Sequence, residues 1–536
     1  MQRKWMRLTA AVLTATMLMG CQKENSTEVA VDNTNRTYYE VFVYSFYDSD
    51  GDGIGDLKGL TEKLDYINDG KASTDTDLGC NGLWLMPIMP STTYHKYDVT
   101  DYKDIDPEYG TLEDFQALVD ACHERGINVI IDLVMNHSSS KHPWFQEACE
   151  YMQSLGEGEE PDATVCPYVD YYNFTKEKKG GYVQIPDTDW YYEAQFWSEM
   201  PDLNLYSDAV REEFADITAF WLDLGVDGFR LDAAKEYVSD NVTANVEILT
   251  WFNDMVKTQK EDAYIVAEVW TDINTYGKYY ESGINSCFDF AFAGNTGIIA
   301  TVVNQAKPAS AYGNALVNMQ EIIGEYSDEY ADAPFYTNHD LARGAGYYAG
   351  NNGESQAKIA QTMNLLMSGD AFLYYGEELG MKGSGKDENK RAPMYWSEDP
   401  DEKGMCNGPA DMDSIKMKYG SLETQKEDAH SIYNYVKKVI WIRNHYEAIS
   451  RGTVTTENEL SGEDICVIRK TGTEDEIVLA FNISDQFQTV DVSALQVNDI
   501  LVGEKQLAEQ ILVGEDQASI KDGRLELPPY GVVVLK

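Results

Sequence analysis

Short apolar runs typical of buried β-strands alternate with amphipathic, helix-like stretches through most of this 536-residue chain. Two of the helix-like stretches, residues 111–125 and 209–224, place apolar residues at helical spacing. Alternating strands and helices form parallel sheets with the helices outside, so eight such strands predict a closed (β/α)8 barrel, the TIM-barrel fold. The predicted strands are residues 40–46, 81–87, 127–134, 226–232, 263–269, 285–290, 333–337 and 370–375.

The spacing of these strands predicts an insertion and a second domain. The interval between the third and fourth strands is much longer than the others, and its residues 138–203 are rich in Tyr, Gly and acidic residues. We therefore predict an inserted subdomain there, with the barrel formed by residues 38–137 and 204–450. Short alternating apolar runs with polar turns then predict a C-terminal antiparallel β-sandwich over residues 451–536.

The N-terminus has the pattern of an export signal. Basic residues precede an apolar stretch, residues 8–19, that is too short to be a comfortable membrane span. The stretch ends in Leu-Met-Gly-Cys, which resembles the signal of a bacterial lipoprotein. We predict a signal peptide over residues 1–20, lipidation of Cys21, and a flexible tether over residues 21–37 that holds the exported chain at the cell surface. An ordinary secretory signal with an incidental cysteine is the alternative.

The charge of the chain argues against a nucleic-acid partner. The formal net charge is −49, and phosphate binding requires clustered Lys and Arg. An apolar fraction of 43% is ample for packed cores, so disorder over most of the chain is not expected. We expect a soluble acidic surface and a monomer.

The cysteines do not form a recognisable framework. Seven remain after Cys21, at irregular spacing and without a CxxC metal pattern. Cys149 and Cys166 lie within one predicted loop region and are a candidate disulfide. Buried free thiols are the alternative for all seven.

Three carboxylates stand where predicted barrel strands end: Asp232 after GVDGFRL, Glu268 after AYIVA, and Asp340 after APFYTNH. The carboxyl ends of the strands meet on one face of such a barrel, so these acids are expected to share one pocket. Glycoside cleavage uses such a set, with one carboxylate attacking the anomeric carbon and another protonating the departing oxygen. A single acid in this position is equally consistent with a helix cap, but three together predict a catalytic site.

Residues 48–56, Asp-Ser-Asp-Gly-Asp-Gly-Ile-Gly-Asp, follow the first predicted strand. Alternating carboxylates separated by glycines allow the backbone to wrap around a hard cation. The string resembles half of an EF-hand loop, although its twelfth position is Gly59 and not the bidentate glutamate. We predict structural Ca²⁺, and a solvated acidic turn without metal is the alternative. The predicted ligands are Asp48, Asp50, Asp52, the Ile54 carbonyl and Asp56.

Taken in order, several strings resemble the motifs of the α-amylase family of glycoside hydrolases, over nearly all of the chain after the tether. The resemblance implies hydrolysis of α-glucosidic bonds on a (β/α)8 barrel with a calcium loop after the first strand. It also implies that Asn136 matches an asparagine that holds a second calcium ion in some members. The strings are DLVMNH (132–137), MPDLN (200–204), GFRLDAAK (228–235), EVW (268–270) and FYTNHD (335–340).

The same resemblance implies a role for each catalytic residue. Asp232 matches the nucleophile, Glu268 the general acid/base, and Asp340 the acid that stabilises the transition state. Arg230 matches the arginine whose fixed charge stabilises and aims the nucleophile. Glu268 must start protonated, so we expect Asp232 and Asp340 to raise its pKa and the activity to be highest at mildly acidic pH.

Further positions match residues that bind the sugar. His137 and His339 match two histidines that hydrogen-bond the sugar in the cleaved subsite, and Tyr97 matches its stacking aromatic. Asp98 lies beside Tyr97. We expect Arg391 to pair with Asp98 and to close the far side of that subsite.

Linkage specificity is less strongly indicated. Lys235 resembles the lysine that binds the leaving-group side in α-1,4-cleaving amylases, and Ala233 stands where α-1,6-specific relatives usually carry Val. Glu236 replaces the His of many α-amylases. MPDLN is intermediate between the forms found in oligo-1,6-glucosidases and neopullulanases, and RAPMYW (391–396) resembles a motif of exo-acting glucosidases.

We therefore predict a lipid-anchored α-amylase that acts on starch and maltooligosaccharides. The alternatives within the family are an exo-acting α-glucosidase, an oligo-1,6-glucosidase or a neopullulanase. A non-catalytic glycan-binding lipoprotein is the alternative in a different class, but a protein that only binds has no need of all three acids.

Overall fold

The computed structural model describes residues 36–536 apart from residues 72–73 and 474. The predicted signal peptide, Cys21 and the tether as far as residue 35 lie outside the described residues. Within the described part, no helix is long and apolar enough to cross a membrane.

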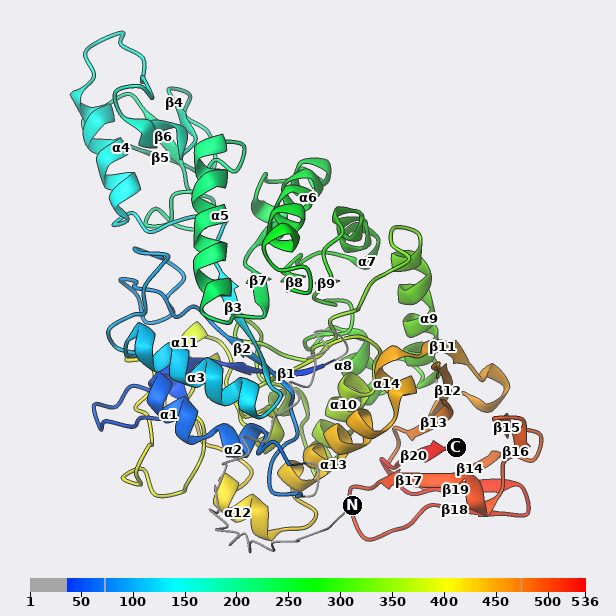
Figure 1. The fold of residues 1–536 in the computed structure, drawn as a ribbon. Coiled ribbons are helices and arrows are strands. Elements are labelled where there is room, and N and C mark those ends of the chain that lie inside the picture. Colours follow the sequence, from blue (N-terminus) through cyan, green and yellow to red (C-terminus); the bar gives the residue numbers. More distant parts are fainter. Residues whose placement is uncertain (1–35, 72–73, 474) are drawn as a thin grey trace, which may run out of the picture. The chain divides into compact units, whose positions relative to one another are not determined.

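Seven parallel strands form the central sheet, in the order β10-β1-β2-β3-β7-β8-β9 (Figure 1). Parallel bridges from Phe288 to Ala333 and from Phe335 to Phe372 connect β9 to β10, so residues 333–335 complete the circle. This confirms the predicted (β/α)8 barrel. The strands are β1 (Thr37–Val41), β2 (Gly82–Leu85), β3 (Asn128–Leu133), β7 (Gly228–Leu231), β8 (Tyr264–Ala267), β9 (Ser286–Cys287) and β10 (Ala371–Tyr374).

Two of the predicted strands differ from the observed ones. The first was placed at 40–46, but the chain enters a 3-10 helix at Val43–Ser45. Strand β1 begins earlier, so Thr37, the last residue of the predicted tether, belongs to the barrel. The seventh, 333–337, makes only the two bridges described above. Pro334 lies within it and has no N–H to donate to a continuous ladder.

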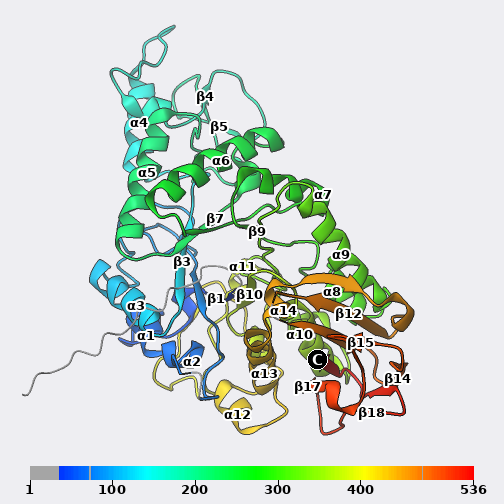
Figure 2. The same cartoon turned by 45° about the vertical axis from the view of Figure 1, so that its right-hand side comes forward.

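Helices cover the outside of the barrel (Figure 2). Helix α3 is typical: the side chains of Thr111 and Asp114 form a capping box at its start, and Phe115, Leu118 and Val119 are buried at helical spacing. The barrel helices are α1 (Leu57–Glu62), α2 (Leu64–Ile67), α3 (Leu112–Glu124), α5 (Asp208–Asp223), α6 (Val242–Gln259), α7 (Ile273–Tyr276), α8 (Ile298–Val303), α9 (Ser310–Gly324), α10 (Gly353–Leu365), α11 (Asp387–Lys390), α12 (Leu422–Glu427), α13 (Ile432–His445) and α14 (Glu447–Arg451).

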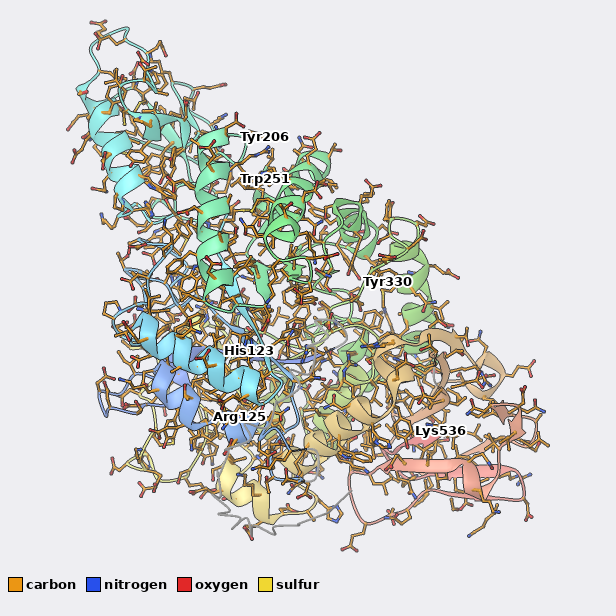
Figure 3. All side chains as sticks on the ribbon, in the orientation of Figure 1. His123, Arg125, Tyr206, Trp251, Tyr330 and Lys536 are labelled. Atoms are coloured by element: carbon orange, nitrogen blue, oxygen red, sulfur yellow. The ribbon has the colours of Figure 1, made fainter. Side chains whose placement is uncertain are left out.

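Contacts between aromatic and basic side chains link neighbouring helices of this layer. The Arg211 guanidinium of α5 lies 5.7 Å from the centre of the Tyr206 ring and 4.8 Å from that of Trp251 in α6. Figure 3 shows these two rings between the helices. Such cation–π contacts strengthen the packing of α5 against α6.

The segment between β3 and α5 contains helix α4 (Pro143–Ser154) and a three-stranded sheet of β4 (Phe174–Thr175), β6 (Tyr191–Glu193) and β5 (Tyr182–Gln184). An antiparallel bridge between His137 and Asp202 joins its two ends, which brings the segment close to the barrel strands that carry the acids. All seven cysteines in the described part of the chain are free thiols, so Cys149 and Cys166 are not paired.

The C-terminal region is a sandwich of two antiparallel sheets, as predicted. In β12, Cys466 and Ile468 pack into the barrel core, whereas Ile465 and Val467 face the second sheet, as the two-residue period of a strand requires. The strands are β11 (Thr453–Thr456), β12 (Ile465–Thr471), β13 (Glu476–Asn482), β20 (Val532–Leu535) and β17 (Leu507–Ile511) in one sheet, β14 (Gln488–Asp491), β19 (Arg524–Leu527) and β18 (Ser519–Lys521) in the other, and the hairpin of β15 (Gln496–Val497) and β16 (Ile500–Leu501).

Candidate active site

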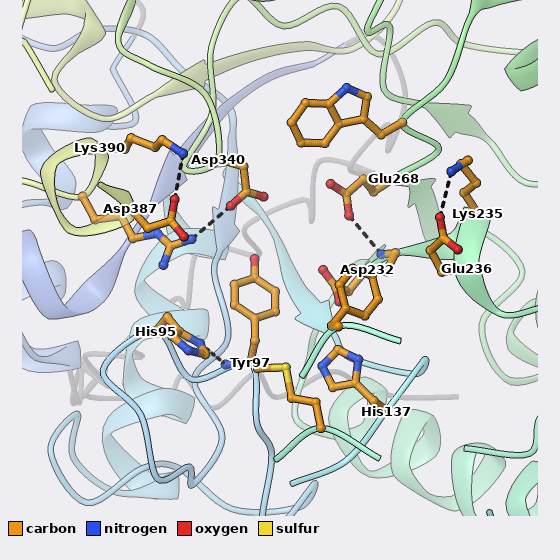
Figure 4. Close-up of a pocket in the computed structure, with 15 residues that line it drawn as sticks. His95, Tyr97, His137, Asp232, Lys235, Glu236, Glu268, Asp340, Asp387 and Lys390 are labelled. Carbon is orange, nitrogen blue, oxygen red and sulfur yellow. Dashed lines mark hydrogen bonds and ion pairs between the residues drawn. The ribbon is translucent and has the colours of Figure 1, made fainter. Parts of the chain in front are cut away.

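A cleft of about 620 Å³ opens at the carboxyl ends of the barrel strands (Figure 4). All three predicted catalytic acids line it. Asp232 follows β7 directly, Glu268 follows β8, and Asp340 follows the strand-like residues 333–335. The residues lining the cleft are His95, Tyr97, His137, Phe196, Met200, Asp232, Ala233, Lys235, Glu236, Glu268, Trp270, Asp340, Asp387, Lys390 and Arg391.

Arg230 holds the acids at the bottom of the cleft from a fully buried position in β7. Its Nη1 donates to Asp232 Oδ1 at 2.7 Å and to Asp132 Oδ1 at 2.9 Å. Its Nη2 lies 3.0 Å from Glu268 Oε2, an ion pair without hydrogen-bond alignment. One guanidinium therefore orients both acids that glycoside cleavage requires, as expected of a rigid, permanently charged fork.

Burial raises the pKa of Glu268 above the ordinary value for glutamate. Arg230 opposes this shift, and the negative charges of Asp232 and Asp340 add to it. The shift of the Glu268 pKa therefore has the expected direction, but its largest cause is burial and not the neighbouring acids. The Ala233 N–H donates to Glu268 Oε2 at 2.9 Å from a left-handed conformation with φ of 48°, which residues other than glycine rarely adopt.

The pKa of Asp340 is shifted in the opposite direction to that of Glu268. Burial raises its pKa, but His339 and Arg391 outweigh burial and hold the pKa far below the ordinary value. His339 Nε2 lies 3.1 Å from Asp340 Oδ2, and Arg391 Nη2 donates to Asp340 Oδ1 at 3.0 Å. The cleft thus combines one carboxyl whose pKa is raised with one whose pKa is lowered.

Of the residues predicted to bind the sugar in the cleaved subsite, two line the cleft and one is buried beneath it. Tyr97 and His137 line the cleft, and His137 Nε2 has no hydrogen-bond partner within the described structure. His339 is fully buried and stacks on the Tyr97 ring at 5.5 Å between centres. His339 therefore acts on the cleft through Tyr97 and Asp340.

The predicted pairing of Asp98 with Arg391 is wrong. The hydroxyl groups of Ser91, Thr92 and Thr93 all donate to the Asp98 carboxylate, and although burial opposes it, these bonds hold its pKa below the ordinary value. Asp98 is fully buried and does not line the cleft. With Asp98 already satisfied, Arg391 pairs with Asp340 instead.

Lys235 lies in the cleft on the side of Glu268, as predicted for a residue that binds the leaving group (Figure 4). Its Nζ pairs with Glu236 Oε1 at 2.7 Å. Asp387 and Lys390 form a second ion pair of 2.7 Å on the opposite side, beyond Asp340. The two ends of the cleft therefore differ in their side chains.

Several residues at the site are not singled out by the sequence, among them His95, Met200, Asp387 and Lys390 of the cleft lining. Trp270 and Phe196 line the cleft and are 50% and 53% exposed. Asp132 bonds Arg230 and Tyr97 from β3, and Glu40 bonds His339 from β1. The sequence does contain an indication that Asp132 and Glu40 are functional. Each places a charge inside a predicted buried strand, and a buried charge is costly without a partner.

The acidic loop after the first strand brings three of the five predicted calcium ligands together. Carboxylate oxygens of Asp48, Asp50 and Asp56 lie within 4.8 Å of one another, a spacing that suits a hard cation with oxygen ligands. Asp52 is not part of this trio, and its Oδ1 accepts from the Ile54 N–H at 2.8 Å.

The family model described as the alpha amylase catalytic domain matches residues 40–452 of this chain. The chain belongs to the α-amylase family of glycoside hydrolases. Alpha-amylase 3 of Dictyoglomus thermophilum is 37% identical over 506 residues, which cover 94% of this chain and 93% of that protein. The structure of Eubacterium rectale Amy13B is 54% identical with a TM-score of 0.88, covering 94% of this chain and 95% of that one.

The family also contains relatives with other names. Trehalose synthase/amylase TreS of Mycolicibacterium smegmatis is 31% identical over 494 residues, which cover 80% of this chain and 79% of that protein. Membership therefore establishes an α-amylase-family glycoside hydrolase and leaves the bond it cleaves to be argued from the cleft.

Proposed function

We propose that this glycoside hydrolase is an α-amylase that cleaves α-1,4-glucosidic bonds in starch and maltooligosaccharides with retention of configuration. The observation that carries the proposal is that Asp232 and Glu268 line one cleft and share one buried guanidinium. Lys235 on the Glu268 side supports α-1,4 cleavage, as does the similarity to a protein named alpha-amylase.

In this proposal, Asp232 attacks the anomeric carbon while Glu268 donates its proton to the departing oxygen. The bond from the anomeric carbon to that oxygen breaks, and an ester to Asp232 forms. Glu268, now ionised, then takes a proton from water as the water oxygen attacks the anomeric carbon and releases Asp232. Two inversions give net retention.

The other residues bind and orient the sugar. Tyr97 offers its ring to the apolar face of the sugar being cleaved. His137 also lines the cleft, and its Nε2, which is buried and without a partner in the described structure, would bond a sugar hydroxyl. Asp340, held ionised by His339 and Arg391, stabilises the positive charge that develops on the sugar ring.

The rate should fall as the solution becomes alkaline. The reaction begins with protonated Glu268, and burial raises the pKa of that group, so its acid form persists to a higher pH than in an ordinary glutamate. As pH rises through this raised pKa, the proton is lost and kcat/KM declines. A profile of kcat/KM on maltooligosaccharides should peak on the acidic side of neutrality, and a steady rise into alkaline pH would contradict the assignment.

We also propose that Asp48, Asp50 and Asp56 hold a structural calcium ion, with Asp52 and the Ile54 carbonyl as the other predicted ligands. Calcium at about a hundred times its Kd would stabilise the fold by roughly 2.7 kcal/mol, so a chelator should lower Tm by a few degrees. Asp50→Ala should abolish this response, whereas Asp52→Asn, which keeps an oxygen ligand at a position outside the trio, should retain most of it. An unchanged Tm after chelation of the unmodified protein would refute the site.

Export and lipid attachment at Cys21 complete the proposal, supported by the apolar stretch and the Leu-Met-Gly-Cys string before the tether. In the bacterial host, the unmodified protein should be recovered with membranes. Cys21→Ser should move it to the soluble fraction. Recovery of the unmodified protein in the soluble fraction would favour the ordinary secretory signal.

Linkage is tested by incubating the chain with soluble starch and with pullulan and separating the products over time. Mixed maltooligosaccharides appearing early from starch support an endo-acting α-amylase. Glucose alone would favour an exo-acting glucosidase, and panose from pullulan would favour a neopullulanase. No product from either substrate would favour a glycan-binding protein.

A further inference from the structure

Glu40 is a fully buried carboxylate in the middle of the first barrel strand. In β1 its side chain shares a face of the strand with Tyr38, which packs in one apolar and aromatic cluster with Trp84 and Phe372. Burying a carboxylate is costly unless it is paired. The partner is His339, 299 residues away in the chain, whose Nδ1 lies 2.6 Å from Glu40 Oε1.

His339 has an acceptor beside each ring nitrogen. Nδ1 faces Glu40, and Nε2 faces Asp340 Oδ2 at 3.1 Å and the Tyr97 hydroxyl at 2.7 Å. A neutral imidazole carries one proton, so a ring that donates to Glu40 from Nδ1 would present a lone pair at Nε2 to Asp340 and to the Tyr97 hydroxyl. The Tyr97 hydroxyl donates its own proton to Asp132 Oδ2 at 3.0 Å, so Nε2 faces only acceptors. The ring that presents an N–H on both sides is the doubly protonated, positively charged one.

The surroundings favour this charge. Burial opposes it, but Asp340 and Glu40 outweigh burial and raise the pKa of His339 to about 9. The Trp84 ring meets His339 edge-on at 5.8 Å and excludes water from that side. The titratable and charged groups around Glu40 and His339 are Tyr97, Asp132, Arg230, Asp340, Tyr374 and Arg391.

We propose that Glu40 is a positioning residue that keeps His339 doubly protonated, so that His339 in turn keeps Asp340 ionised and aimed into the cleft. The three side chains form a carboxylate–imidazolium–carboxylate relay from Glu40, buried in β1, to Asp340 in the cleft. The catalytic part of this inference rests on the proposed function, because Asp340 matters there as the acid that stabilises the transition state.

The test is the pH dependence of Glu40→Gln, which keeps the shape of the side chain and removes its charge. Without Glu40, only Asp340 still opposes burial, so the pKa of His339 falls and the ring loses its proton at a lower pH than in the wild type. The ratio of wild-type to variant kcat/KM should be smallest at acidic pH, should grow by up to about tenfold per pH unit between the His339 pKa of the variant and that of the wild type, and should then level off. Taking the ratio cancels the titration of Glu268, which both proteins share.

Glu378→Gln is the matched control. Glu378 is also fully buried, accepts from the Tyr39 and Tyr66 hydroxyls at 2.7 and 2.6 Å, and does not line the cleft. Any effect of this variant should be the same at every pH. A pH-independent ratio for Glu40→Gln as well would reduce Glu40 to a structural role and overturn the proposal.

Histidine ring NMR reads the charge state directly in the unmodified chain. Long-range ¹H–¹⁵N spectra near neutral pH should show both His339 nitrogens protonated, with the signal assigned by its loss in His339→Gln. A neutral tautomer overturns the proposal even if Glu40→Gln does not fold. If the wild type cleaves no α-glucan, the proposed function fails. The spectrum still decides whether His339 is positively charged between Glu40 and Asp340.

Discussion

Asp232→Asn is expected to lower kcat on maltooligosaccharides by about 10⁴-fold or more while leaving the fold intact. In the unmodified chain, Arg230 Nη1 donates to Asp232 Oδ1 at 2.7 Å. The amide of the variant keeps the shape of the carboxylate and can keep this contact, but it has no negative charge with which to attack the anomeric carbon. Substrate should still bind, so KM should change far less than kcat. The measurement is steady-state kinetics at a pH near the optimum, with Tm as the check on folding.

Two comparisons make this result specific to a nucleophile. Asp387→Asn changes another cleft acid, one that is paired with Lys390 and distant from Glu268, and should cost less than about tenfold. Azide should restore turnover to Asp232→Ala and yield a glycosyl azide of inverted configuration, because the small anion replaces the missing carboxylate. A loss of only a few-fold in Asp232→Asn would exclude Asp232 as the nucleophile.

Glu268→Gln should lower kcat on starch by about 10³-fold, within the range found for loss of a general acid. The effect should depend on the leaving group. An α-glycosyl fluoride departs without a proton, so its first step should lose much less than the same step on starch.

The comparison is made by measuring the first step on both substrates in the presence of excess enzyme. The second step uses Glu268 as a base for both, so the glycosyl-enzyme should accumulate when the fluoride is used. Equal losses on starch and fluoride in the first step would show that Glu268 is not the acid.

Much of the fold could be predicted because it depends on local patterns. The alternation of strand-like and helix-like runs requires a parallel barrel, and the helix predicted at 111–125 is observed as α3 with its capping box at Thr111 and Asp114. Boundaries were less certain, since β1 ends where the chain turns into a 3-10 helix and not where its apolar run ends.

The convergence of Asp232, Glu268 and Asp340 could also be predicted, because each stands at the end of a barrel strand. Pairings within the site could not. Whether Asp98 needs Arg391 depends on three neighbouring hydroxyl groups folding back on its carboxylate. The contact of Glu40 with His339 joins the first barrel strand to the turn after residues 333–335, which only the closed barrel brings together. The hydrogen-bond partners of Asp98 and Glu40 depend on the tertiary structure, which short sequence motifs do not specify.

The measurement that tests the central claim most directly is the configuration of the first sugar released. Proton NMR of maltooligosaccharide hydrolysis, followed from the first minutes, distinguishes the two anomers before they interconvert. Attack by Asp232 followed by attack of water predicts that the α-anomer appears first and that the β-anomer grows in only by mutarotation. Initial release of the β-anomer would mean a single displacement by water, and would contradict a covalent intermediate on Asp232.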